Sequence, residues 1–500
     1  MTLFATIHAP SLPPERVQRL AARLAPLAVT IAGDTLTIER DPFGTQPLYY
    51  ATIDDALVVT NALAALKQLV PRTLNREAIA DYLAYGYNGN EATTTFAAIQ
   101  RVPPAHRLIA TRDGIRIERW WSLPIASEPL RIKPRDAVER FRELLRDAVQ
   151  RQAAQGRVVV SLSGGIDSVS VAAHLTSTGA HATAITSVWD PVIPDVERHF
   201  ASLAARSLGL PHILHECAGY QPFDRFDDPA VRGEEPHSEP FRAAFIDFLG
   251  RAAQHGRIFM TGQGGDPLLY ASHDHFWRLL QKVKLLTFAS DALGFALKRR
   301  RLPPLLLRSR LLRTLGRKTP ARVLPPWFDT GFAREMHLAE RFATPPPRTD
   351  PRIHPWRDDA FRLLHSPAWS VTFESFHEGV TRQPLALATP WLDPAVVEFL
   401  FALPPMPFFA DKELAREALR GRVPDEIRLR PKSPLQGDPL RTLGPAHLKR
   451  WVRQVEQVPE LEQFVSRRIL CMQSTQMERE IVSVAAAVAL ALWLLGERSR

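Results

Sequence analysis

A turn rich in serine and glycine carries the clearest chemical signal in this sequence. Residues Ser161–Ser168 read Ser-Leu-Ser-Gly-Gly-Ile-Asp-Ser and lie between the apolar run Val158–Val160 and an apolar-periodic segment. This order predicts a strand, a glycine turn and a helix. Gly164 and Gly165 let the backbone pass close to a phosphate, and the N-terminus of the helix supplies amide donors and a positive dipole end.

The side chains of this turn add to the same prediction. Ser163 and Ser168 supply hydroxyl donors, and Asp167 is a carboxylate that could hold Mg²⁺ against phosphate oxygens. A turn with only a structural role is the alternative, but strand, glycines, acid and helix all stand in the order that a phosphate site needs. No GxxxxGK[ST] or GxGxxG run competes with it.

A second glycine turn, Thr261–Asp266, also follows a predicted strand. Because ligands bind beyond the carboxyl ends of strands in open α/β sheets, we expect the two turns to form one site. Asp167 and Asp266 could then share one Mg²⁺. Asp266 could instead cap a helix, since Gly-Asp-Pro suits that position.

The elements around these turns alternate between strand and helix patterns, so we expect a parallel, doubly wound sheet in an α/β fold. A length of 500 residues indicates two or more domains. Residues 1–125 look β-rich, with a hairpin over Val29–Arg40, and the part from about 270 onward looks mostly helical. The expected elements of the central part are helix 136–152, strand 157–162, helix 168–179, strand 182–188, helix 195–208 and strand 257–261.

Composition favours a folded soluble protein, with 45% hydrophobic and 23% charged residues. Cys217 and Cys471 lie far apart without CxxC spacing, which indicates a reducing compartment and no disulfide framework or zinc site. The N-terminus has no signal-peptide pattern, so a cytoplasmic location is expected. Ile481–Leu495 is nearly all apolar but shorter than the roughly 20 residues that span a bilayer, which favours a buried C-terminal helix over membrane insertion.

Residues 298–322 hold ten Lys and Arg and no acid, interleaved with leucines, within a chain of net charge +10. Three interpretations stay open: a solvated basic face, a surface for an acidic or extended peptide, or contact with a membrane surface or nucleic acid. No nucleic-acid-binding module accompanies the segment, so a nucleic-acid partner is not expected.

Several segments together resemble the class B asparagine synthetase family, over most of the chain from about residue 30 to 440. The resemblance implies a glutaminase-type N-terminal domain of the Ntn-hydrolase kind over 1–125. It also implies an ATP-pyrophosphatase (PP-loop) synthetase domain with a helical C-terminal part over 126–500. The segments that carry it are Asp41–Gly44, Val102–His106, Ser163–Ser168, Thr261–Asp266, Pro390–Asp393 and Arg430–Lys432.

The resemblance also implies an activity. Such enzymes cleave ATP between its α and β phosphates to adenylate a carboxylate, with Mg²⁺ held here by Asp167 and Asp266. Lys432 would stabilise the developing charge, and Glu374 is offered as a general base. The implied contacts to ATP and pyrophosphate are Ser161, Ser163, Gly164, Gly165, Asp167, Ser168, Ser187, Gly262, Gly264 and Gly265.

The sequence departs from asparagine synthetases at both ends of the expected reaction. Glutamine-dependent relatives use a cysteine directly after the initiator methionine, where this chain has Thr2 and no cysteine before Cys217. We therefore expect an N-terminal domain that makes no ammonia. In the second turn, Gln263 and Pro267 stand where asparagine synthetases carry acids, so the attacking amine is expected to belong to the substrate itself.

Two related groups lack the cysteine and close rings: β-lactam and carbapenam synthetases, and lasso peptide macrolactam synthetases. The absence of a tyrosine at Gln263 and the basic, leucine-rich segment favour the lasso cyclases, which join a peptide's N-terminal amine to an Asp or Glu side chain. A precursor peptide, a leader peptidase and a recognition element are then the implied partners. The alternatives are a small-molecule lactam synthetase, an ammonia-dependent asparagine synthetase-like enzyme, and a non-catalytic peptide-binding scaffold.

Overall fold

The computed structural model describes most of the chain. The described residues are 5–7, 28–32, 34–53, 56–270, 275–299, 324–344, 348–431, 437–466 and 481–498. Lys432, Thr2, Cys471 and nearly all of the basic segment lie outside them.

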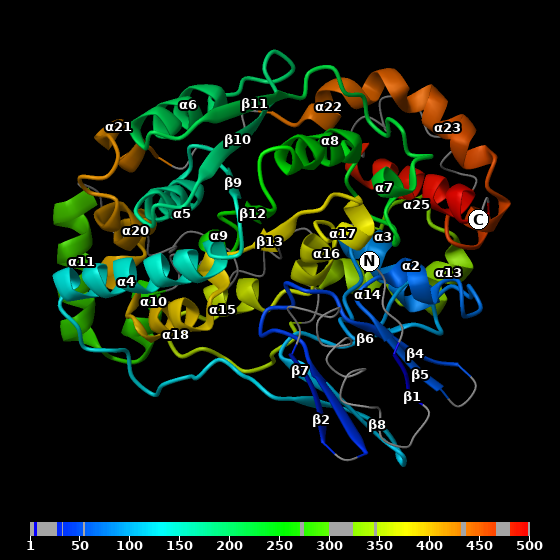
Figure 1. The fold of residues 1–500 in the computed structure, drawn as a ribbon, viewed down its shortest axis with the longest axis horizontal. Helices are drawn as coiled ribbons and strands as arrows, with labels where there is room; N and C mark the ends of the chain where they lie inside the picture. Colours follow the sequence, from blue (N-terminus) through cyan, green and yellow to red (C-terminus); the bar gives the residue numbers. More distant parts are fainter. Residues whose placement is uncertain are drawn as a thin grey trace.

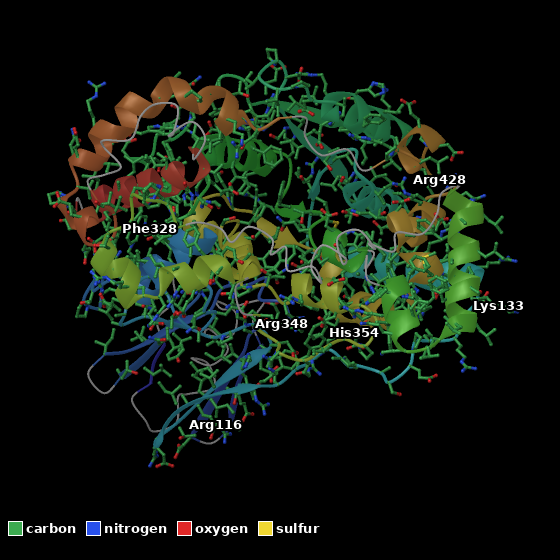
Figure 2. The ribbon with its side chains drawn as sticks, turned by 180° about the vertical axis from the view of Figure 1, so that it is seen from behind. Arg116, Lys133, Phe328, Arg348, His354 and Arg428 are labelled. Atoms are coloured by element: carbon green, nitrogen blue, oxygen red, sulfur yellow. The ribbon has the colours of Figure 1, made fainter. Side chains whose placement is uncertain are left out.

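Two four-stranded antiparallel sheets form the N-terminal domain, in the lower half of Figure 1. Leu36, Leu57 and Leu108 come from the two sheets and share one buried cluster. The hairpin predicted over Val29–Arg40 is present. In sheet order, the strands are β1 (Ala5–Ile7), β5 (Ala56–Thr60), β4 (Tyr49–Ile53) and β6 (Gln100–Arg101), and then β2 (Ala28–Ala32), β3 (Thr35–Glu39), β7 (His106–Thr111) and β8 (Gly114–Arg119). Figure 2 shows Arg116, on β8, at the tip farthest from the larger domain.

A five-stranded parallel sheet forms the centre of the larger domain. Its order is β11 (His212–Glu216), β10 (Ala182–Val188), β9 (Val158–Ser161), β12 (Ile258–Met260) and β13 (Ala386–Ala388). The predicted parallel sheet is confirmed, but β11 and β13 were missed. β13 has only three residues, and β11 carries histidines at a half-buried and a buried position, so neither strand shows a clear apolar period.

Helices cover both faces of this sheet, as Figure 1 shows for α5 and α8. Val158 and Val160 pack in the cluster that contains α4 (Pro134–Ala153), α5 (Ile166–Thr176) and α6 (Glu197–Ser207). Val159, which points the other way, packs against α8 (Arg242–Ala253). The three consecutive valines of β9 therefore reflect burial on both faces of the sheet.

The remaining helices of the described chain are mostly short and surround this core. They are α2 (Leu63–Leu66), α3 (Arg76–Tyr85), α7 (Pro229–Arg232), α9 (Gly265–Leu268), α10 (His275–Gln281), α11 (Leu285–Arg299), α13 (Thr330–Glu335), α14 (Leu338–Ala343), α15 (Asp358–Leu364), α16 (Ala368–Glu374), α17 (Glu378–Thr381), α18 (Pro394–Ala402), α19 (Pro405–Phe408), α20 (Glu413–Ala418), α21 (Asp425–Arg428), α22 (Pro439–Leu443), α23 (Leu448–Glu456) and α25 (Ile481–Arg498).

The two domains are joined by a shared hydrophobic cluster that includes α25. Phe96 of the N-terminal domain contacts Trp493 of α25, with ring centroids 5.7 Å apart. Within the described residues, α25 is the one helix with the length and composition of a membrane span, but 61% of it is buried, and buried core helices pass the same test. The prediction of a buried C-terminal helix is confirmed. The predicted boundary near residue 125 falls between β8 and α4 and stays a prediction.

Candidate active site

The first glycine turn connects β9 to α5 and is held in shape by its own side chains. Gly164 has a φ of +68°, and a Cβ there would lie 2.6 Å from the Cβ of Phe200 on α6, so only glycine fits. The Ser168 hydroxyl accepts a hydrogen bond from the Ser163 amide and donates one to the Gly165 carbonyl, both at 3.1 Å. This leaves the N-terminus of α5 open toward the site.

The second glycine turn packs directly on the first. A Cβ on Gly262 would lie 2.7 Å from the amide nitrogen of Ser168, and one on Gly265 would lie 2.6 Å from Cγ of Asp167. These two glycines therefore allow contact between the turns, whatever they add to phosphate binding. Gly264, with a φ of +90°, lets Leu392 pack against the turn.

This packing brings Asp266 to the side of Asp167. The cap of α9 is Gly264, and Asp266 lies in the first turn of that helix. The alternative interpretation of Asp266 as a helix cap is therefore wrong, because Gly264 takes the left-handed conformation at that position. The side chain of Asp266 is free of that structural task and faces the site.

Lys412 joins the two carboxylates, and sequence reasoning missed it. Its Nζ donates to Oδ2 of Asp167 at 2.5 Å and to Oδ1 of Asp266 at 2.7 Å. Asp411 and Lys412 both have left-handed backbones, with φ of +50° and +60°. Such conformations cost about 1–3 kcal/mol each and persist where surrounding structure enforces them. Arg416 does so here by donating to the Asp411 carbonyl at 2.6 Å.

Two cavities adjoin at these carboxylates, and both are lined by Ser163, Asp167 and Asp266. The first, which we name the basic cavity, has a volume of about 210 Å³ and is lined by Gly164, Gly165, Ile166, Glu197, Lys412, Arg416, Ile427, Arg430 and Pro431 as well. The second, the aromatic cavity, has about 440 Å³ and is also lined by Ser161, Ser168, Phe245, Phe248, Phe259, Thr261, Gly262, Gln263, Gly264, Pro267, Trp369 and Phe376.

The basic cavity has the donors that a pyrophosphate needs: turn amides, one lysine and two arginines. Glu197 is the third acid of this cavity, beside Asp167 and Asp266. Burial raises its pKa to about 7, with Asp195 adding to the shift and Arg430 opposing it. At neutral pH this carboxyl group is therefore close to half-protonated, which reduces its repulsion of phosphate.

Asp167 and Asp266 fit a Mg²⁺ ion that bridges to phosphates. Mg²⁺ on nucleotides is commonly bound by one or two carboxylates, with phosphate oxygens and waters completing its shell. Lys412 already marks the space between the two carboxylates as a place for positive charge. No group of three or more His, Cys, Asp or Glu side chains suited to a metal occurs among the described residues.

Three predicted site residues are not among those that the described structure places at the two cavities. Ser187, at the end of β10, contacts the Cys217 sulfur at 3.0 Å and lines neither cavity. Glu374 lies on α16 but faces away from the aromatic cavity, which Trp369 of the same helix lines. Lys432 lies outside the described residues, although its neighbour Pro431 lines the basic cavity. The roles assigned to these three stay predictions.

Glu374 belongs instead to a buried ion cluster between the domains. Its Oε1 lies 2.8 Å from Nε of Arg101 and 3.6 Å from Nη2 of Arg40. Arg101 also pairs with Glu235. Burial, together with the charge of Glu374, raises the pKa of Tyr49 well above its usual value. This cluster fills the contact between the N-terminal domain and α16.

A parallel sheet with two glycine turns and a carboxylate pair at its carboxyl edge defines an α/β domain of the class that binds ligands at that edge. Comparison with known families makes this specific. The family model "Asparagine synthase" matches residues 140–494, and the model "Glutamine amidotransferase domain" matches residues 17–121. The chain belongs to the asparagine synthase family, whose members are ATP-dependent carbon–nitrogen ligases.

Individual relatives are more distant. "Asparagine synthetase [glutamine-hydrolyzing] 2" of Bacillus subtilis is 31% identical over 249 residues, which are 45% of this chain and 33% of the relative. "Asparagine synthetase [glutamine-hydrolyzing] 3" of the same organism is 28% identical over 27% of this chain and 22% of the relative. The chain thus spans a third or less of these two relatives. The solved structure of NMN synthetase from Francisella tularensis is 19% identical, covering 26% of this chain and 54% of its own, with a TM-score of 0.18 that carries no argument.

Proposed function

We propose that this protein is an AMP-forming macrolactam synthetase of the lasso-cyclase type. ATP, with Mg²⁺ on Asp167 and Asp266, adenylates the side-chain carboxylate of an Asp or Glu in a precursor core peptide. The N-terminal amine of the same peptide then attacks the acyl-adenylate, and the products are the ring, AMP and pyrophosphate.

The lining of the aromatic cavity is the observation that carries this proposal. A free amino acid substrate brings its own ammonium and carboxylate groups, and each needs a charged or hydrogen-bonding partner when it leaves water. Among the described residues that line this cavity, Asp167 and Asp266 alone are charged, and Lys412 already binds both. Five aromatic side chains form much of the remaining wall. Such a wall suits the side chains and backbone of a peptide better than a free amino acid.

The two departures in the second turn support the same conclusion. Gln263 and Pro267 both line the aromatic cavity, so the loss of two acids changes the substrate side of the site and leaves the phosphate side intact. An amine that belongs to the substrate also needs no ammonia source. Holding both ends of one peptide in place raises the effective concentration of the amine by orders of magnitude, up to about 10⁵ M or more in favourable intramolecular cases.

The partners follow from the same proposal. A leader peptidase would release the core peptide and a recognition element would deliver the precursor. The basic segment 298–322, with its ten Lys and Arg, is a candidate surface for an acidic or extended part of that precursor. Lys432, which follows Pro431 in the sequence, is the proposed stabiliser of charge during adenylation.

Mass spectrometry tests the proposal directly. Purified protein is incubated with ATP, Mg²⁺, the leader peptidase and a precursor peptide encoded nearby. The expected product is lighter than the linear core by one water and forms together with AMP. Asp167→Ala should abolish both products, while the exposed control Asp113→Ala, on the turn between β7 and β8, should not.

Two other outcomes would overturn it. If the core stays linear while free aspartate and ammonia yield AMP and asparagine, the protein is an ammonia-dependent asparagine synthetase-like enzyme. If no carboxylate supports ATP–pyrophosphate exchange, the chain is a non-catalytic scaffold. Lys412, between Asp167 and Asp266, argues against that second outcome. A site without activity has no reason to keep the strained backbones of Asp411 and Lys412, which place this lysine side chain.

A further inference from the structure

The aromatic side chains of this cavity pack on one another and form one wall of it. The Phe245 and Phe376 rings meet edge to face at 4.9 Å, and Phe376 stacks on Phe259 at 5.9 Å. Phe248 contacts Phe259 in turn at 5.8 Å. These contacts come from α8, β12 and the chain just after α16, so the wall is part of the fixed core of the domain. A group that packs against this wall loses its contact with water on that side.

Gln263 lines the same cavity and carries an acceptor that no described residue satisfies. Its Oε1 is buried and has no hydrogen-bond donor among the residues that the structure describes. A buried acceptor without a partner costs about 1–3 kcal/mol, so native structures keep few of them without a reason. The residue lies in the second glycine turn, where its backbone N–H donates to the Thr261 hydroxyl at 3.4 Å. Its side-chain oxygen is thus a buried acceptor in the lining of a cavity.

An acceptor of this kind calls for a ligand that carries an N–H group. We infer that Gln263 binds the attacking amine of the substrate through Oε1 and that the aromatic cavity keeps this amine uncharged. The inference rests on the proposed function and adds to it the residue that orients the nucleophile. Burial disfavours the charged form of an amine, which lowers its pKa from the usual range of about 7.7–8.0 for an α-amino group.

This arrangement also accounts for how the reaction proceeds without a carboxylate that acts as general base on this side of the cavity. The two acids among the described lining residues, Asp167 and Asp266, are both bound to Lys412. A neutral amine needs no base before it attacks. Its lone pair forms the C–N bond to the acyl carbon, and the C–O bond to AMP breaks with its electron pair leaving on the phosphate. The extra proton on nitrogen passes to the departing AMP, whose second phosphate pKa is about 6.

The test separates the two half-reactions on one preparation of enzyme. Adenylation is measured by ATP–pyrophosphate exchange with the core peptide, and ring closure by the loss of one water. Gln263→Leu keeps the size of the side chain but removes the acceptor. We expect the ratio of closure to exchange to fall about tenfold to hundredfold, as one hydrogen bond to a reacting group is lost. Hydrolysis of the stranded acyl-adenylate should then release AMP and linear core.

Two comparisons make the result specific. Gln150→Leu changes an exposed glutamine on α4 that lines neither cavity, and its ratio should match the wild type. Gln263→Glu restores an acceptor but adds a charge that stabilises the ammonium form, so its closure rate should recover only at higher pH. Equal losses in exchange and closure for Gln263→Leu would overturn the inference alone. Absence of exchange with every core peptide would overturn the proposed function, and the inference with it.

Discussion

Two of the ion clusters in this protein are built differently. Lys412 with Asp167 and Asp266 borders two cavities, and the side chain of Asp266 is 61% exposed. Arg101 with Glu374 is sealed between the domains, with side chains 1% and 8% exposed. The first group can exchange its partners for a nucleotide and its metal, whereas the second can only hold its own partners. The exposed fraction of the side chains therefore distinguishes the two groups. We name the group around Lys412 the open cluster and the group around Arg101 the sealed cluster.

Breaking the sealed cluster should have the largest effect on stability. Glu374→Ala removes the carboxylate nearest Arg40 and leaves Arg101 with Glu235 alone, and removing one partner of a buried pair costs about 3–5 kcal/mol. Urea denaturation should show this loss. The milder Glu374→Gln keeps hydrogen-bonding capacity, and the fraction that folds should close rings at the wild-type rate. Loss of closure in folded Glu374→Gln would instead support Glu374 as the general base.

Breaking the open cluster should abolish chemistry with little loss of stability. Lys412→Met removes the positive charge between the two carboxylates, and we expect ATP–pyrophosphate exchange to fall about 10²–10³-fold. The melting temperature should change little, because the hydrogen bond from Arg416 to the Asp411 carbonyl stays in place. Lys133→Met is the control, since Lys133 is exposed and lines neither cavity. A similar loss of exchange in both variants would show that the effect does not depend on the lysine between the two carboxylates.

The two clusters also differ in how far sequence alone could predict them. The glycine turn at 163–165 was predicted because its chemistry depends on neighbours within a few residues of one another. Lys412 was missed because its partner Asp167 is 245 residues away and because Ala410–Glu413 reads as an ordinary helix start. The Arg101–Glu374 pair spans 273 residues, so no local pattern could assign Glu374 to it. The parallel sheet followed from alternation, but its three-residue edge strand β13 did not.

A pH dependence should sharpen the comparison, because Glu91 lies beside the sealed cluster. Burial raises the pKa of Glu91 to about 7, with Arg40 and Arg101 opposing the shift. The folded state therefore holds this proton more tightly than the unfolded state, whose pKa is near 4.5. Stability is fully present below about pH 4.5 and falls as pH rises to about 7, by at most about 3 kcal/mol.

Glu91→Gln removes this dependence. Its melting temperature relative to the wild type should rise steadily between pH 4.5 and 7 and level off above. The buried histidines do not blur the result, because the pKa of His174, for instance, is lowered by burial to about 4 and its titration affects both proteins alike. A gap in melting temperature that stays constant with pH would mean that Glu91 is already ionised in the folded protein.

The smallest effect should come from the position where glutamine-dependent relatives carry their nucleophile. Thr2, which lies outside the described residues, could act only if its hydroxyl replaced a thiol and its freed α-amine served as base. If the amine comes from the peptide and the sealed cluster joins the two domains only structurally, ammonia has no use here. Thr2→Ala should then close rings within about twofold of the wild-type rate, the range in which surface substitutions usually fall. Glutamine should neither be hydrolysed nor change the rate. Glutaminase activity that disappears in Thr2→Ala would mean that the N-terminal domain supplies the nitrogen after all. The chemistry would then be shared between the two domains, and the sealed cluster that joins them would have more than a structural role.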